Sequence, residues 1–451
     1  MRSLHASRAA RPGRAPRAPR SLRPSRVSRL PRSSRPRRAL LASAIGVALA
    51  VPLVLPQAAA AGPAALPHGG AAPEAAARTG GVQSLALRPL ETDTRGGGET
   101  AAPLGAQGLP STDTEPFSLV GVVWTDPAAE LHGTVEVRTR QAGTTTWSDW
   151  QSLDAQATHA PDPGSSETGG TALRGGTAPL WVGPSDGVQA RVVPEEGDQA
   201  APLPEGLSLE LVDPGEAPAQ EAAEDDDGDE GDGSGEEGEA EQRSGAAQAG
   251  EFEGPRPPIV IRSGWGADEG LRESGFVYTD TVKTVFVHHT AGSNNYSCSE
   301  APSLIRSIYR YHVESQGWRD VGYNFFVDKC GTIYEGRAGG VAEPVQGAHT
   351  LGFNHNSSGV AVLGTHSSTA PSSDVRDALS LLTAWKLGLH DGNPSGTRNR
   401  TSSGGSYASG TTIRLNNISG HRDGYATDCP GDQLYGLLPA VRKRASELQG
   451  R

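Results

Sequence analysis

Short runs of alternating apolar and polar residues fill the chain from about residue 84 to residue 214. Alternation with a period of two is typical of strands that bury one face. Gly, Pro and Asp separate the runs, and none of them continues with the period of a helix. The pattern therefore predicts a β-sandwich as a β-rich accessory domain over residues 83–214. The runs that carry this prediction lie at residues 84–90, 117–124, 133–140, 146–150, 188–193 and 207–212.

Beyond residue 256 the pattern changes, because strand-like runs now alternate with segments of helical period. This alternation predicts an α/β domain over residues 256–451, with a mixed central β-sheet flanked by helices. Its strands are expected at residues 281–287, 323–327, 332–334, 359–363 and 413–418. Its helices are expected after the capping box Ser297-x-x-Glu300, over residues 374–389, and from Asp432, a suitable N-cap, to about residue 448.

Four tryptophans lie in the predicted β-rich domain, at Trp124, Trp147, Trp150 and Trp181. They could form an aromatic face that binds sugars, or they could pack in the core and between strands. We favour packing, since large aromatic side chains commonly fill cores and nothing in the sequence identifies a ligand.

The first 61 residues have the features of an export signal. Residues 1–39 contain thirteen Arg and no acid, so they cannot form an apolar core. Residues 40–55 are apolar but too short and Pro-interrupted to span a membrane comfortably, and small residues follow for signal peptidase. Arg37-Arg38 before Ala-Leu-Leu is similar to a twin-arginine signal. We therefore expect residues 1–61 to be a signal peptide.

Two further segments lack the apolar residues of a folded domain. Residues 62–82 are rich in Ala, Gly and Pro and are expected to be a flexible lead-in. Residues 221–241 hold twelve acids and no base, which predicts an acidic disordered linker over residues 215–255. Calcium binding is the alternative for this run, but no loop with a Gly turn would order the ligands, so we favour a solvated tether.

The charge distribution excludes two classes of partner. The formal net charge is −12, and removal of the thirteen Arg of residues 1–39 would leave −25. No basic stripe indicates a nucleic-acid partner, and no apolar segment after the signal indicates a membrane anchor. We expect a monomer that is secreted.

Only three cysteines occur, which is an odd count for an exported chain. One arrangement accounts for all of them, with a disulfide between Cys298 and Cys330 and a free thiolate at Cys429. The rival arrangement places Cys429 in a disulfide. We favour the first, because Cys429 lies among the residues of a candidate metal site and the other two cysteines do not.

That candidate site consists of His288, His421 and Cys429. His288 ends a strand-like run, and His421 also follows one, so both lie where open sheets place their functional residues. Two imidazoles and a thiolate suit Zn²⁺, and three protein ligands leave the fourth tetrahedral position for water. Zinc brings the pKa of such a water toward neutrality, so that the water can attack an amide carbonyl. The sequence therefore predicts a zinc hydrolase.

Six motifs between residue 258 and about residue 450 closely resemble those of peptidoglycan recognition proteins and phage lysozyme-type N-acetylmuramoyl-L-alanine amidases. The motifs are Val-Phe-Val-His-His-Thr-Ala (285–291), Gly-Trp-Arg-Asp-Val-Gly-Tyr-Asn-Phe (317–325), Gly-Thr-Ile-Tyr-Glu-Gly-Arg (331–337), Gly-Ala-His (347–349), Asn-His-Asn-Ser-Ser-Gly-Val-Ala-Val-Leu-Gly (354–364), and Gly-His-Arg-Asp with Thr-Asp-Cys-Pro-Gly-Asp (420–432). The resemblance implies a zinc-dependent amidase domain whose partner is peptidoglycan, a glycan strand with stem peptides, and so a protein associated with the cell wall.

The resemblance also implies roles for single residues. It makes His288, not His289, the first zinc ligand, with His421 and Cys429 as the others. Tyr323 matches the catalytic tyrosine of the family, whose hydroxyl can stabilise a developing oxyanion.

Four further positions take their roles from the same motifs. Thr427 stands where phage members have Lys and many catalytic recognition proteins have Thr, so it is expected to assist catalysis. Arg337, His349 and Asn354 match positions that line the substrate groove of the family. Cys298 and Cys330 match no ligand position.

These observations favour hydrolysis of the amide bond between the lactyl group of N-acetylmuramic acid and L-Ala. A non-catalytic recognition protein that only binds peptidoglycan is the main alternative, although such proteins often replace the metal-binding cysteine, and Cys429 is present. A purely structural zinc protein would need a fourth protein ligand, which the motifs do not contain.

Overall fold

The computed structural model describes residues 79–90, 103–155, 159–165, 172–195, 202–216 and 252–451. All of them belong to one compact unit, Pro73–Arg451. The predicted signal peptide, and most of the predicted lead-in and acidic linker, lie outside the described residues. Among the helices of the described part of the chain, none is both long enough and apolar enough to cross a bilayer.

The described residues between 79 and 216 form an antiparallel β domain with one eight-stranded sheet, in which six strands follow the path β1-β8-β3-β7-β4-β5 and β2 and β6 each pair with β3. A sandwich was predicted, but the strands are not divided into two separately bonded sheets. The reason is the long strand β3, which carries register shifts and pairs with β7, β8, β2 and β6. The strands are β1 (Gly81–Ala86), β2 (Arg88–Pro89), β3 (Gln107–Trp124), β4 (Gly133–Gln141), β5 (Gln151–Leu153), β6 (Gly175–Gly176), β7 (Leu180–Pro194) and β8 (Ser208–Asp213).

The tryptophans of this domain pack rather than form an exposed aromatic face. Trp124 and Trp181 are buried in apolar clusters. Trp150 is half-buried, with the guanidinium groups of Arg138 and Arg191 over its ring.

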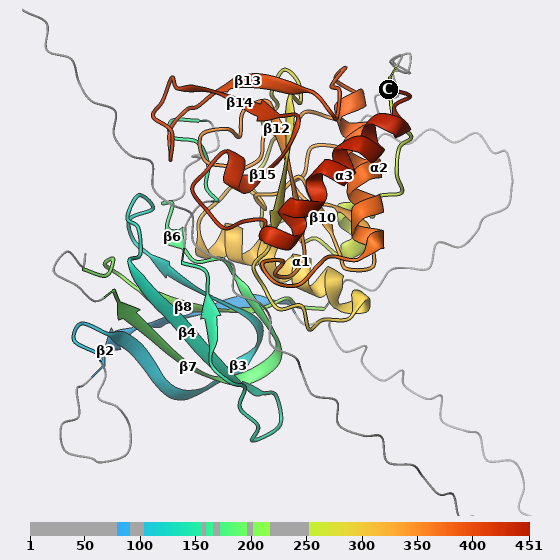
Figure 1. Ribbon diagram of the computed structural model, residues 1–451. Helices are drawn as coiled ribbons and strands as arrows, with labels where there is room; N and C mark the ends of the chain where they lie inside the picture. Colours follow the sequence, from blue (N-terminus) through green and yellow to red (C-terminus); the bar gives the residue numbers. More distant parts are fainter. Residues whose placement is uncertain (1–78, 91–102, 156–158, 166–171, 196–201, 217–251) are drawn as a thin grey trace, which may run out of the picture. The chain divides into compact units, whose positions relative to one another are not determined.

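The second domain is the predicted α/β fold, with a five-stranded mixed sheet in the order β11-β10-β12-β9-β15. β10, β12, β9 and β15 run parallel, while β11 is antiparallel to β10. The strands are β9 (Thr284–His289), β10 (Phe325–Val327), β11 (Ile333–Glu335), β12 (Ser357–Val362) and β15 (Ile418–Gly420), and a separate hairpin joins β13 (Thr397–Thr401) to β14 (Thr412–Asn416). Helices α1 (Ala301–Arg310), α2 (Ser373–Gly388) and α3 (Asp432–Leu448) complete it (Figure 1).

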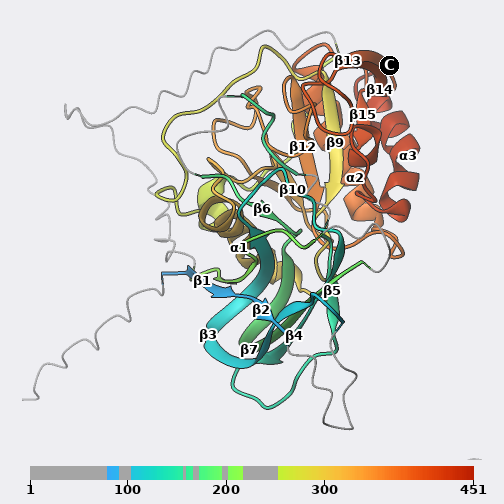
Figure 2. The same ribbon diagram turned by 90° about the vertical axis from the view of Figure 1, so that its left-hand side faces the viewer.

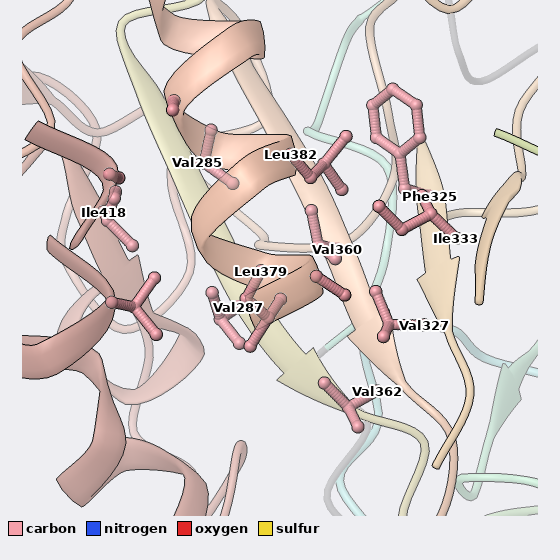
Figure 3. Close-up of a cluster of buried hydrophobic side chains, with 14 of the residues drawn as sticks. Val285, Val287, Phe325, Val327, Ile333, Val360, Val362, Leu379, Leu382 and Ile418 are labelled. Atoms are coloured by element: carbon pink, nitrogen blue, oxygen red, sulfur yellow. The ribbon is translucent and has the colours of Figure 1, made fainter. Parts of the chain in front are cut away.

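Helices cover both faces of this sheet, as Figure 2 shows for α1 on one side and α2 and α3 on the other. Leu379 and Leu382 of α2 lie against the valines of β9 and β12 in the largest apolar cluster (Figure 3). Because strand side chains alternate between faces, Val285 and Val287 are committed to this cluster and Phe286 and His288 point to the other face.

The residues that cap the first turns of α1 and α3 differ in part from those predicted. The predicted capping box at Ser297 and Glu300 is present, although it opens a short 3₁₀ turn (Cys298–Glu300) that leads into α1. The N-cap of α3 is Gly431 and not Asp432, which was the prediction. Asp432 lies in the first turn instead, where its carboxylate accepts a 2.7 Å hydrogen bond from Arg422 and is stabilised by the helix dipole.

The two domains share an apolar cluster. Leu119, Val123, Trp181 and Val212 of the β domain pack with residues of α1 such as Ile305. Tyr311, which follows α1, is buried and donates a 3.0 Å hydrogen bond from its hydroxyl to the carbonyl of Thr177. The β domain is therefore packed against the α/β domain by a continuous core.

We expect Gly121→Ala to loosen this packing. A Cβ at Gly121 would lie 2.4 Å from Cε2 of Tyr311, so the ring must shift, at a cost of about 1 to 3 kcal/mol. Gly81→Ala is the control, since a Cβ there meets no atom within 4 Å. The free energy of unfolding from denaturant titrations gives the comparison, and equal values for the two variants would contradict the shared core.

Cys298 and Cys330 are joined in a disulfide, and Cys429 is free and buried. The bond links the start of the α1 region to the turn between β10 and β11, over a sequence separation of 32.

We expect replacement of both cysteines by Ser to destabilise the protein by roughly 3 to 4 kcal/mol, because the unfolded chain is then no longer restricted by the disulfide. A reducing agent should lower the unfolding temperature of the wild type and leave that of the double variant unchanged; an equal response of both would count against this.

Candidate metal centre

Two parallel strands bring the predicted histidine ligands together. β9 ends in His288 and His289, and β15 pairs with it in a register that sets Gly420 opposite Val287. His421, the residue directly after β15, therefore lies beside His288 at the carboxyl edge of the sheet. This is the edge at which the sequence predicted the site.

His288 joins the cluster of ligand atoms, and His289 does not. The alternation of side chains explains the difference, because neighbouring residues of β9 face opposite sides of the sheet. The Nδ1 atom of His289 instead accepts a hydrogen bond from the backbone N–H of His366. Its own backbone N–H donates to Sγ of Cys429 at 3.4 Å, so His289 supports the site without entering it.

The cluster holds four candidate ligands and not the three that the sequence predicted. Ligand atoms of His159, His288, His421 and Cys429 all lie within 4.8 Å of one another. The fourth, His159, comes from the β domain, where it lies between β5 and β6 in the chain. The sequence offered no signal for it, since Ala-Thr-His-Ala-Pro-Asp-Pro matches no metal-binding motif.

The chemistry of these donors fits a zinc ion. Burial lowers the pKa of His288, and it lowers the pKa of His159 to about 4, so both are neutral imidazoles with a free lone pair. The Nε2 atom of His159 is buried and has no hydrogen-bond partner among the described residues. Burial raises the pKa of the Cys429 thiol, so a thiolate here needs a nearby cation. A divalent metal would bind the imidazole lone pairs and stabilise the thiolate of Cys429.

Tyr323 and Thr427, the predicted catalytic residues, both lie beside the cluster. The ring of Tyr323 is buried, with its centroid 5.4 Å from that of His288 and 5.5 Å from that of His159. Burial raises the pKa of Tyr323 well above its usual value, and the charges of Cys429 and Asp154 add to this, so the hydroxyl keeps its proton. The Thr427 hydroxyl accepts a 3.2 Å hydrogen bond from the backbone N–H of Cys429.

His349, which was predicted to line the substrate groove, lies behind His288. It is fully buried, and its Nδ1 atom is 3.3 Å from Nε2 of His288 and 3.0 Å from the hydroxyl of Thr350. The other ring nitrogen of His288, Nδ1, lies 3.8 Å from Sγ of Cys429. His349 is therefore placed to orient His288, which turns Nδ1 toward the remaining ligands.

Arg337 and Asn354, the other predicted groove residues, are also buried. The guanidinium of Arg337 donates to the backbone carbonyls of Val321, Gln346 and Asp320 at 2.8 to 3.2 Å, so it holds the loops around β10 together. The side-chain oxygen of Asn354 accepts from the backbone N–H groups of His349 and Thr350. Its amide nitrogen donates to residues of the β domain.

Comparison with known proteins identifies the class of each domain. Residues 278–432 match the family described as N-acetylmuramoyl-L-alanine amidase, so three of the four candidate ligands, His288, His421 and Cys429, lie in an amidase-type domain. Residues 73–225 match the family described as Rv3811 N-terminal galactose-binding domain-like.

Individual proteins are similar to part of this chain. Peptidoglycan-recognition protein SC2 of Drosophila simulans is 31% identical over 179 residues, which cover 39% of this chain and 82% of that protein. The human N-acetylmuramoyl-L-alanine amidase is 34% identical over 188 residues, 40% of this chain and 28% of that protein. A crystal structure of peptidoglycan recognition protein-LE in complex with tracheal cytotoxin is 27% identical, with a TM-score of 0.33 over 40% of this chain and 92% of that one. The chain belongs to the peptidoglycan-recognition protein family.

We expect His349→Ala to lower the zinc affinity of the full chain about 10- to 100-fold, the usual effect of removing a group that orients a ligand. His390→Ala is the control, because His390 is a half-buried histidine beyond the end of α2 and outside the cluster. Competition with a chromophoric zinc chelator measures both affinities. An unchanged affinity for His349→Ala would show that His288 needs no support from this side.

Proposed function

We propose that the protein is a secreted zinc-dependent N-acetylmuramoyl-L-alanine amidase, which hydrolyses the bond between the lactyl group and L-Ala in peptidoglycan. The observation that carries the proposal is the free, buried Cys429 beside His288 and His421. A thiolate among imidazoles suits zinc, and Sγ of Cys429 lies 3.8 Å from Nδ1 of His288. The similarity to the human enzyme of that name supports the same reaction.

The residues around the centre have the chemistry that amide hydrolysis needs. Bound zinc would polarise the amide carbonyl and lower the pKa of the attacking water. Tyr323 keeps its proton, so its hydroxyl can donate a hydrogen bond to the oxyanion that forms at the carbonyl. The Thr427 hydroxyl accepts a hydrogen bond from the N–H of Cys429. Its own O–H proton can therefore be donated to the same oxyanion, in addition to that of Tyr323.

His288 and His421 would hold the metal with Cys429, while His349 keeps the His288 ring in place through its 3.3 Å contact. The side-chain amide nitrogen of Asn354 donates to Ala160 and Asp162, which lie outside the loop of Asn354. We assign this nitrogen to binding a carbonyl or carboxylate of the stem peptide. Arg337 contributes indirectly, by fixing the backbone next to Tyr323.

A peptidoglycan-binding protein without catalysis is the second candidate, because several relatives are named for recognition and not for hydrolysis. The two functions differ in whether a stem peptide is released. Binding requires the groove alone, whereas release requires the metal and Tyr323 as well.

Defined muropeptides incubated with the full chain and zinc should release free stem peptide, detected by chromatography and mass spectrometry. Cys429→Ala should lower the rate by on the order of 1,000-fold or more, since it removes one of the three ligands that would hold the metal; this corresponds to about 4 kcal/mol of transition-state stabilisation. His390→Ala should retain the wild-type rate.

If neither the full chain nor its His159→Ala variant releases stem peptide, but both retain muropeptides, the recognition protein is the better description.

A further inference from the structure

A short segment of the β domain, residues 159–163, lies in the metal centre of the other domain. It lies between β5 and β6 in the chain, so it belongs to the β domain and has no counterpart in the amidase motifs. Three of its residues contact groups that the amidase reaction would use. His159 lies at the candidate ligands, and Ala160 and Asp162 lie at Asn354.

His159 has the position of a fourth ligand. Its ring centroid is 4.6 Å from that of His421 and 5.3 Å from that of His288, and the ring also meets Tyr323 edge-on. Its Nε2 atom is buried without a hydrogen-bond partner among the described residues, which is costly unless something else binds it. Since a catalytic zinc site keeps three protein ligands and an open position, His159 stands where the open position would be.

The residues after His159 occupy the adjoining groove. The carbonyl of Ala160 accepts a 2.9 Å hydrogen bond from Nδ2 of Asn354. One carboxylate oxygen of Asp162 accepts from the same Nδ2 at 2.8 Å and from the backbone N–H of Gly352 at 2.7 Å. Asp162 is buried, which raises its pKa, and the side chain of Ser403 and the backbone N–H of His355 also donate to its carboxylate.

The groups that the loop offers are those of a peptide ligand. A backbone carbonyl and a carboxylate, a few residues apart, are also what a stem peptide presents. Pro161 and Pro163 flank Asp162 and restrict its backbone, so the loop loses little conformational freedom when it binds. The shared core between the domains holds the loop near the centre at high effective concentration.

We propose that residues 159–163 hold the enzyme in a latent state, in which His159 fills the fourth zinc position and Ala160 and Asp162 occupy the substrate groove. This inference rests on the proposed amidase function, but the assignment of His159 as a ligand does not. Activity then requires that the loop leaves both positions, and peptidoglycan competes with the loop for Asn354 and Gly352.

The first test reads the metal coordination directly and needs no substrate. The full chain is loaded with Co²⁺ in place of zinc, and its visible spectrum is recorded while azide is added. Four protein ligands leave no position for the anion, so the wild-type spectrum should not change. The spectrum of His159→Ala should shift in a saturable way, because the fourth position is then open. The control is His132→Ala, a histidine of the same domain whose side chain is 45% exposed, and it should behave like the wild type.

The second test reads release of the loop from the groove. Asp162→Ala leaves all four candidate ligands in place but removes the carboxylate that Gly352 and Asn354 bind. We expect it to raise the rate of stem-peptide release roughly tenfold or more, since a closed state that is populated at 90% or more hides at least nine-tenths of the activity. Asp162→Asn, which keeps an acceptor oxygen of the same shape, should raise the rate less.

The outcomes separate the two proposals. Azide binding by wild-type Co²⁺ protein, or no difference between wild type and His159→Ala, would overturn the fourth-ligand assignment. An azide response confined to His159→Ala, without stem-peptide release by any variant, would support that assignment and contradict the amidase function. A wild-type rate equal to those of His159→Ala and Asp162→Ala would show active amidase without latency.

Discussion

The parallel pairing of β9 with β12 and β15 is the constraint on which the centre depends. β9 is the buried strand between them, and its valines at 285 and 287 pack under α2. That packing fixes which face each side chain takes, so His288 must point away from α2, toward the face where His421 arrives from β15. A slip of one residue would bring His289 to that face and send His288 into the apolar cluster. The apolar positions of β9 therefore determine the ligand as firmly as the histidine itself does.

A second core, shared by the two domains, decides what else reaches this centre. Trp181 and Val123 of the β domain pack with α1 and Tyr311 in one cluster, and the loop that carries His159 extends from the same domain. Apolar packing is not directional, and it holds the domains together without specifying a site. The hydrogen bonds of Asp162 and Ala160 to the groove supply the direction. Apolar packing thus holds the domains together, and the hydrogen bonds place the loop in the groove. Only these hydrogen bonds can be replaced by those of a ligand with similar groups.

The sequence predicted the α/β fold well because each of its elements has a local signal. The capping box at Ser297, the apolar period of α2 and the runs before His288 and His421 all refer to residues close in the chain. The same motifs named His288, His421 and Cys429, which lie in one cluster in the structure. His159 could not be found in this way, because its place depends on contacts between residues more than a hundred positions apart. The continuous path of the β domain was missed for a related reason, since alternation reveals strands but not which strands they pair with.

The buried polar groups of the centre can be understood only together. Several imidazoles and a thiol lie in a water-poor site, where burial lowers the pKa of the histidines and raises that of Cys429. Without a cation this arrangement would be costly to fold, since the Nε2 atoms of His159 and His349 are buried without a hydrogen-bond partner among the described residues. A metal bound by three of these residues would remove most of that cost, and a fourth ligand would remove the rest. The folded state with the least unsatisfied polarity is therefore the closed one, and an open centre must be stabilised by substrate in place of His159 and Asp162.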